Sequence, residues 1–126
     1  MGENAAIVRA MLEDYLRGDV DASLAHFHEE VEWRDQFGTY QGRQGVAESV
    51  TRWAGTWESL EMEITEMIEA GDHVVVMMRQ TGRGRGSGVP VEGITAWLYT
   101  VRDGKIASAR VYPVAADALR DAGLSD

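Results

Sequence analysis

Residues 31–38 read VEWRDQFG, and the first five of them alternate in polarity. In an extended strand Val31, Trp33 and Asp35 point to one side, and the polar residues between them point to the other. An acid therefore follows two large apolar residues on the face expected to be buried. Burying a carboxylate is costly unless it has partners or a use, so Asp35 is a candidate functional residue.

The residues before and after this strand show helical periodicity. Apolar residues recur every three or four positions behind a capping Asn4 and stop at Gly18, and Asp21 can cap a second, short helix. Gly38 and Gly42 bracket a turn, after which residues 43–57 return to helical spacing. Three helices are expected, with the strand at 31–35 between the second and the third.

The second half of the chain favours strands. Turn residues separate four β-like ranges, 60–70, 73–81, 89–101 and 106–112, which predict an antiparallel meander. Residues 114–122 predict a short final helix that stops at Gly123. Helices first and hairpins afterwards predict one α+β domain over residues 1–126, in which a curved antiparallel sheet packs against N-terminal helices and encloses an apolar pocket.

The composition and net charge exclude several classes of function. The chain has 126 residues, 21 acidic against 12 basic side chains, a formal net charge of -9 and no cysteine. That charge opposes binding to nucleic acid and to anionic membranes. The missing cysteines exclude disulfides and a thiol nucleophile. No apolar run approaches the roughly 20 residues of a membrane span, and the acidic start differs from a secretory signal. A soluble, cytoplasmic protein is expected.

The charge is unevenly distributed. Residues 1–70 hold 15 acids and 5 arginines, whereas residues 71–126 hold 6 acids and 7 basic residues. The excess negative charge therefore belongs to the helical half. The nearly neutral sheet half leaves room for an anionic or carbonyl-bearing ligand.

Four short motifs, in this order and spacing, carry a resemblance to a known family. They are YLRGDV at 15–20, VEWRDQFG at 31–38, Gly42-Arg43, and RDGKI at 102–106. The chain resembles, over nearly its whole length, the SnoaL-like and ketosteroid-isomerase-like proteins of the nuclear transport factor 2 superfamily. The resemblance implies a cone with a deep apolar cavity. The superfamily includes isomerases, polyketide cyclase-like enzymes, lyases and binding proteins, so the fold alone does not give the function.

The functional residues of the isomerases are compared with this sequence one at a time. Asp35 matches the aspartate that serves the isomerases as general base. The tyrosine that donates to the oxyanion there falls at Met11, and the second donor falls near Trp97 or at Ala96. Of these replacements, only the Trp97 indole N–H is a donor. The steroid isomerase mechanism, which needs both a base and an oxyanion hole, is therefore half missing.

Arg79 is the second candidate catalytic residue. It lies in an apolar strand, where a cation needs a partner. That partner is Asp35, Glu92 or an anionic ligand group, unless the position is structural or exposed. Residues expected to bind the ligand are apolar or aromatic, with a polar handle on several: Met11, Tyr15, Trp33, Met77, Trp97, Tyr99 and Val111.

The histidines and the glycine-rich range 82–88 do not predict a metal site or a phosphate site. His26 and His28 are two residues apart and cannot face one ion from a regular helix, and His73 lies beside a turn, so no metal is expected. The glycine-rich range 82–88 leads into a strand, which favours a hairpin loop or a lid over a phosphate cradle. No cofactor is expected.

Two functions remain open, and a purely structural dimer is a third. One is a cofactor-free enzyme that moves a proton on a small hydrophobic carbonyl compound, with Asp35 as base and Arg79 or Trp97 stabilising developing charge. The other is a non-catalytic protein that holds a hydrophobic ligand. Both faces of the strand at 73–81 carry few polar residues, which favours a homodimer through the outer face of the sheet.

Overall fold

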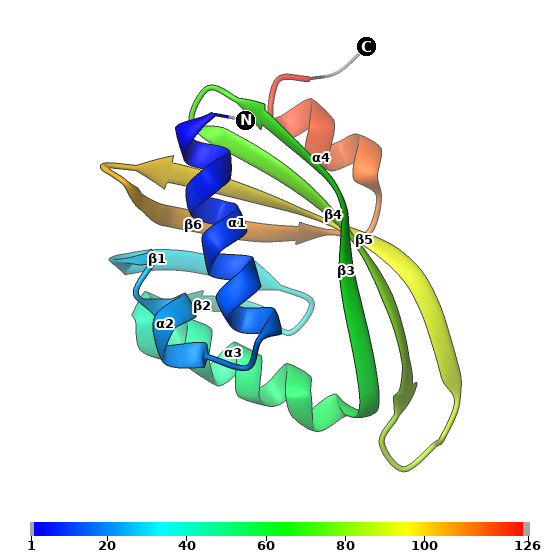
Figure 1. Cartoon of the computed structure of the whole chain (residues 1–126). Helices are drawn as coiled ribbons and strands as arrows, with labels where there is room; N and C mark the ends of the chain where they lie inside the picture. Colours follow the sequence, from blue (N-terminus) through cyan, green and yellow to red (C-terminus); the bar gives the residue numbers. More distant parts are fainter. Residues whose placement is uncertain (1, 125–126) are drawn as a thin grey trace.

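The computed structural model describes residues 2–124 and shows the expected α+β fold, a curved and unclosed six-stranded sheet packed against helices (Figure 1). The elements follow in the order α1 (Glu3–Leu16), α2 (Val20–Leu24), β1 (Phe27–Asp35), β2 (Gly38–Gln41), α3 (Gly42–Thr56), β3 (Trp57–Ala70), β4 (His73–Gly84), β5 (Pro90–Arg102), β6 (Lys105–Tyr112) and α4 (Ala115–Asp121).

The sheet has the strand order β2-β1-β6-β5-β4-β3. Strands β3 to β6 form the predicted antiparallel meander. β1 joins it in parallel, with Trp33 beside Ala109. β2 pairs with β1 where the sequence suggested only a turn, because Gly38 has φ +140° and lets the chain reverse directly after Asp35.

Helices cover both faces of the sheet, unequally. α1, α2 and α3 lie over the concave face, and α4 packs on the opposite face (Figure 1). The larger core joins α1, through Val8, to the inward side chains of the strands, including Phe27 and Val76. A smaller cluster holds α4, through Ala118, against Val75 and Ala96 among others.

The helix ends differ from the sequence prediction. α1 begins at Glu3 with Gly2 at its N-cap, and Asn4 instead donates to the Gly71 carbonyl (3.1 Å). Asp19, not Asp21, caps α2 by accepting from the Ala22 N–H (3.1 Å). The reasons differ: Asn4 lies inside the first turn of α1 and bonds the distant Gly71 carbonyl, whereas α2 begins at Val20, so Asp19 and not Asp21 stands at its N-cap.

The β4–β5 hairpin is fixed to the end of α3. Arg85 donates to the carbonyls of Gly55 and Trp57 (3.1 Å each), and its own N–H donates to Thr56 O (2.9 Å). A cation at a helix C-terminus is favourable because the carbonyl ends carry partial negative charge.

Within residues 2–124, no helix is both long and apolar enough to cross a membrane.

Candidate functional site

A cavity of about 340 Å³ lies between the three N-terminal helices and the concave face of the sheet. Most of its walls are apolar or aromatic. It is lined by Met11, Leu12, Tyr15, Val20, Ser23, Leu24, Phe27, Trp33, Asp35, Gln36, Val46, Ser49, Val50, Trp53, Met62, Met78, Gln80, Thr95, Trp97, Tyr99, Val111 and Pro113.

Asp35 lies at the end of β1, where the chain turns sharply into β2, and its side chain lines the cavity. It is 9% exposed. The alternation that places Val31 and Trp33 on the buried face of β1 places Asp35 there too. The carboxylate is therefore the acid at the wall of an apolar cavity.

Three donors hold the Asp35 carboxylate. The Phe37 N–H donates to Oδ1 (2.8 Å), while the Trp33 indole N–H (3.2 Å) and the Ser49 hydroxyl both donate to Oδ2. A carboxylate offers about four acceptor positions, two on each oxygen. Oδ2 is thus fully used, and Oδ1 keeps one position free. None of the three partners is charged.

An aromatic row extends from Asp35 along the cavity wall. The ring centroids are 5.8 Å apart for Phe27 and Trp33, 4.7 Å for Trp33 and Trp97, and 5.9 Å for Trp97 and Tyr99, the last pair being stacked. Offset and edge contacts of this kind add stability beyond area burial. The row makes a rigid wall suited to a flat, apolar ligand.

Two tyrosines, Tyr15 on α1 and Tyr99 on β5, also line the cavity. Burial raises the pKa of Tyr99 far above its usual value, and the nearby Tyr15 phenol raises it further. Burial also raises the pKa of Tyr15. Both side chains are therefore neutral phenols at physiological pH, each with a hydroxyl hydrogen to donate.

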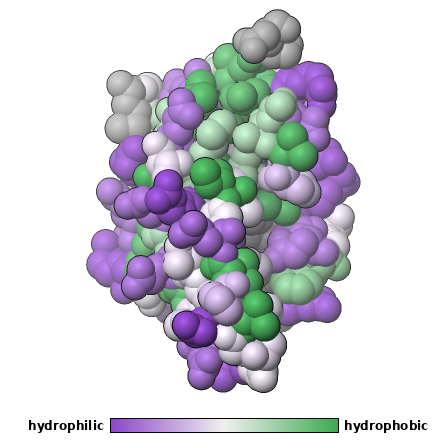
Figure 2. Space-filling model, turned by 90° about the vertical axis from the view of Figure 1, so that its right-hand side faces the viewer, coloured by the Kyte–Doolittle hydropathy of each residue, from purple (hydrophilic) through white to green (hydrophobic). Residues whose placement is uncertain are grey.

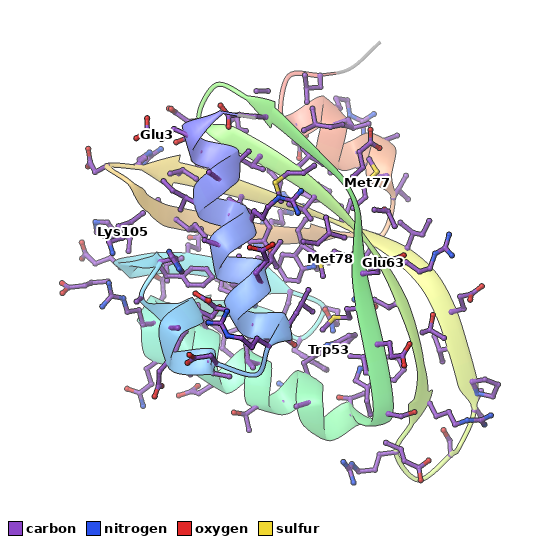
Figure 3. The ribbon with its side chains drawn as sticks, in the orientation of Figure 1. Glu3, Trp53, Glu63, Met77, Met78 and Lys105 are labelled. Atoms are coloured by element: carbon purple, nitrogen blue, oxygen red, sulfur yellow. The ribbon has the colours of Figure 1, made fainter. Side chains whose placement is uncertain are left out.

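The structure brings together most of the residues singled out from the sequence. Asp35 and six of the expected ligand contacts line the cavity, namely Met11, Tyr15, Trp33, Trp97, Tyr99 and Val111. Met77 and Arg79 do not line it. Met77 packs with the α4 cluster on the outer face, and Arg79 is exposed. Figure 3 shows Met77 and Met78 pointing to opposite sides of β4.

Several cavity residues were not predicted from the sequence. Met78 and Gln80 occupy the inward positions of β4, where the prediction had placed Met77 and Arg79. Ser49 comes from α3, and Thr95 shares the inward face of β5 with Trp97. Ser49 was detectable from helical spacing, because it lies three positions after the apolar Val46.

A wider groove of about 1030 Å³ adjoins the cavity at the edge strand β3. The two share Tyr15, Val50, Trp53 and Met62, among others, so the groove is the approach to the cavity. Arg79 borders this groove. The other charged side chains around it are acidic: Glu13, Glu58, Glu61 and Glu63.

The histidines and the glycine-rich loop have structural contacts. His26 Nε2 bonds Asp14 (3.0 Å), and His73 Nδ1 bonds the Thr100 hydroxyl (3.0 Å). Among the described residues, no three potential metal ligands cluster. Arg83 donates to the Gly88 carbonyl (2.9 Å) across the base of the loop.

A match to a known protein family shows to which family the chain belongs. The SnoaL-like domain family matches residues 8–109, which is most of the chain. The protein therefore belongs to the SnoaL-like family, as the sequence motifs suggested. A comparison with curated proteins finds no match.

Solved structures share the fold. One is a protein from Catenulispora acidiphila with a ketosteroid isomerase-like fold in complex with trimethylamine (26% identity, 94% and 92% of the two chains, TM-score 0.75). Another is TerC, co-crystallised with polyporic acid (23%, 88% and 91%, TM-score 0.79). A third is a SnoaL-like polyketide cyclase, so assigned provisionally, from Jannaschia sp. CCS1 (20%, 87% and 84%, TM-score 0.79).

Proposed function

We propose that this protein is a cofactor-free enzyme that moves a proton on a small hydrophobic carbonyl compound, with Asp35 as the base. One observation carries the proposal, the buried carboxylate that lines an apolar cavity and keeps an acceptor position free on Oδ1. Carbon acids beside a carbonyl need a base held in place and shielded from water. The three donors to Asp35 provide that fixed orientation.

The reaction begins when Oδ1 takes a proton from a carbon conjugated to the carbonyl. The C–H bond breaks, an O–H bond forms on Asp35, and the electron pair moves into the enolate. Return of the proton to a different carbon gives an isomer. Attack of the enolate carbon on a second carbonyl forms a C–C bond and an alkoxide, which takes the proton back from Asp35 to give the cyclised alcohol. Either outcome fits the isomerase and cyclase types found in this fold.

The Asp35→Asn variant tests the assignment. We expect it to lower the deuterium exchange of 2-tetralone in D₂O at least about 100-fold relative to the wild type, because a positioned base contributes roughly 10²–10⁴-fold. NMR follows the exchange. The amide leaves one of the three donors without an acceptor, so we also expect a loss of about 1–3 kcal/mol in the free energy of unfolding.

Glu32→Gln is the matched control. Glu32 lies on the same strand as Asp35 but is exposed on the opposite face, and its substitution is expected to change neither rate nor stability. Ser49→Ala retains the base while removing one donor, so we expect a smaller loss of rate. Unchanged exchange in a folded Asp35→Asn protein would rule out Asp35 as the base.

The alternative function is storage or transport of a hydrophobic ligand. It is favoured by the aromatic row of the cavity, which suits binding without chemistry. The two functions differ in one result. A binding protein takes up 2-tetralone without accelerating its exchange, whereas the enzyme does both.

We further propose that two copies associate through the outer patch, defined as Glu63, Arg79, Thr81, Glu92 and Ile94 on the outward side of β3, β4 and β5. These residues are cross-strand neighbours, and Ile94 is 55% exposed. Apolar side chains run down this side of the molecule between polar ones (Figure 2). Because the patch holds both Arg79 and the acids Glu63 and Glu92, we expect a twofold axis through it to pair Arg79 of one copy with an acid of the other, as a self-complementary interface requires.

A further inference from the structure

β3 is the last strand of the sheet, so one edge of its backbone has no neighbouring strand (Figure 1). Residues 58–64 of this strand all line the groove that leads to the cavity. Within the described range 2–124, their backbone pairs only with β4. Alternate N–H and C=O groups of an edge strand point away from the sheet and can pair with another extended chain. The groove therefore contains an unpaired strand edge roughly 20 Å long.

The side chains along this edge alternate between the two faces of the sheet. Leu60, Met62 and Ile64 are partly buried on the concave side, and Glu61 and Glu63 are exposed on the outward side. A strand laid beside β3 places its own side chains in the same alternation. One set of them meets the apolar row, and the other set meets the carboxylates.

The rest of the groove has an apolar wall and a negative charge. Its other wall comes from α1 and α3, with Leu16 and Trp53 among the lining residues. Glu13 and Glu58 add two acids to those of the edge. Arg79 is the one basic side chain among the described lining residues, and it lies one strand further in, on β4. Four carboxylates against one guanidinium favour a basic partner.

We propose that the β3 edge binds, as an added strand of the sheet, an extended peptide in which basic and apolar residues alternate. Main-chain hydrogen bonds to residues 58–64 hold its backbone, its apolar side chains pack beside Leu60 and Met62, and its basic side chains pair with Glu61 and Glu63. In this mode of recognition the main chain supplies affinity and the alternating side chains supply specificity. The surface is separate from Asp35, and a peptide bound there covers the approach to the cavity.

The acids of the edge exclude a second copy of this chain as the occupant. Two β3 edges paired with each other bring glutamates of one copy beside glutamates of the other, and like charges on adjacent strands are destabilising. Charged side chains on edge strands commonly prevent such self-pairing. A basic strand meets no such repulsion.

Fluorescence anisotropy of a labelled peptide measures the binding. The probe KVKIKVK alternates basic and apolar residues, and KKKKVIV has the same composition without the alternation. We expect KVKIKVK to bind at least about fivefold more tightly, because only the alternating order places the two kinds of side chain on opposite faces. Equal affinities would overturn the proposal, since a general attraction of cations to an acidic protein does not depend on their order.

Backbone methylation tests the strand addition itself. One derivative of KVKIKVK is methylated on the nitrogens of its three apolar residues, and the other on those of its last three lysines. Alternate N–H groups of a strand point to opposite sides, so one derivative should lose at least about tenfold in affinity, as three missing hydrogen bonds would give. The other should bind nearly as well as the parent. Similar affinities of the two derivatives would contradict binding as a strand.

Glu61→Lys reverses one charge of the edge, and unlike Glu63 this residue lies outside the outer patch. We expect it to weaken KVKIKVK about fivefold and to strengthen binding of the acidic peptide EVEIEVE. Glu66→Lys is the matched control, because it changes the net charge equally on the same strand but outside the groove. It should leave both affinities nearly unchanged, and equal effects of the two variants would disprove the site. These measurements need no turnover, so a failure of the Asp35 mechanism would be seen separately.

Discussion

Two local partners and one distant partner hold the Asp35 carboxylate at the end of β1. The alternation of VEWRD places this side chain on the apolar face of the strand. Two of its donors, the Phe37 N–H and the Trp33 indole, lie within two residues of it. The third, Ser49, arrives on α3, and no local pattern shows which helix face meets the end of β1.

Tyr99 makes the stability of the protein depend on alkaline pH. Its pKa is raised above the usual value of about 10 by burial and by Tyr15. Below pH 10 the phenol is neutral in both the folded and the unfolded chain. Above pH 10 the unfolded chain loses this proton and the folded one keeps it, so stability falls as the pH rises.

Urea unfolding between pH 8 and pH 11 measures this effect. In the wild type the free energy of unfolding should decline above pH 10, with Tyr99 contributing up to about 1.4 kcal/mol per pH unit. Tyr99→Phe lacks that proton and should show a shallower decline. Identical slopes for the two proteins would show that Tyr99 does not ionise on unfolding.

At the scale of elements, β4 explains why the cavity could be predicted only in part. Its residues Val74, Val75 and Val76 are all fully buried, because the core covers one face and α4 covers the other. With both faces apolar, the alternation of β4 gives no polarity from which to choose the inward set. Met77 and Arg79 were therefore assigned to the cavity, although Met78 and Gln80 line it.

The β3–β4 hairpin depends on close approach at one glycine. A Cβ on Gly82 would clash with the Ser59 carbonyl oxygen, a backbone atom that cannot move without breaking the strand pairing. We expect Gly82→Ala to lower the free energy of unfolding by about 1–3 kcal/mol, as overpacking does. Urea denaturation measures the loss.

Gly93→Ala on β5 is the control for this substitution. A Cβ there meets nothing within 4 Å, so the alanine should be neutral or slightly stabilising through its smaller backbone entropy in the unfolded chain. Equal stabilities of the two variants would contradict a close contact at Gly82.

At the scale of the whole molecule, association should depend on Ile94, the exposed apolar residue of the outer patch. Sedimentation velocity should show a dimer for the wild type and a monomer for Ile94→Glu, since a carboxylate at the centre of an interface is costly to desolvate. Val89→Glu changes an equally exposed valine at the hairpin end and should leave the dimer intact. A monomeric wild type would disprove the dimer.

The overall architecture was the most predictable part of the molecule. The helices follow from periodicity, and the four long strands follow from β-rich ranges that turn residues separate. The hairpin strand β2 and the parallel pairing of β1 with β6 were not predicted. Both depend on contacts between distant segments, and a four-residue strand such as Gly38–Gln41 has too few residues for a periodic signal.

The parallel pairing of β1 with β6 also determines when the site can form during folding. Trp33, close to Asp35 on the cavity wall, lies beside Ala109, which is far along the chain from it. A ribosome must therefore release every residue from β1 to β6 before β1 has its neighbour. Such long-range pairing raises the contact order and slows folding. The wall that carries Asp35 is thus completed only after β6 has been synthesised, and a chain that ends before β6 lacks it.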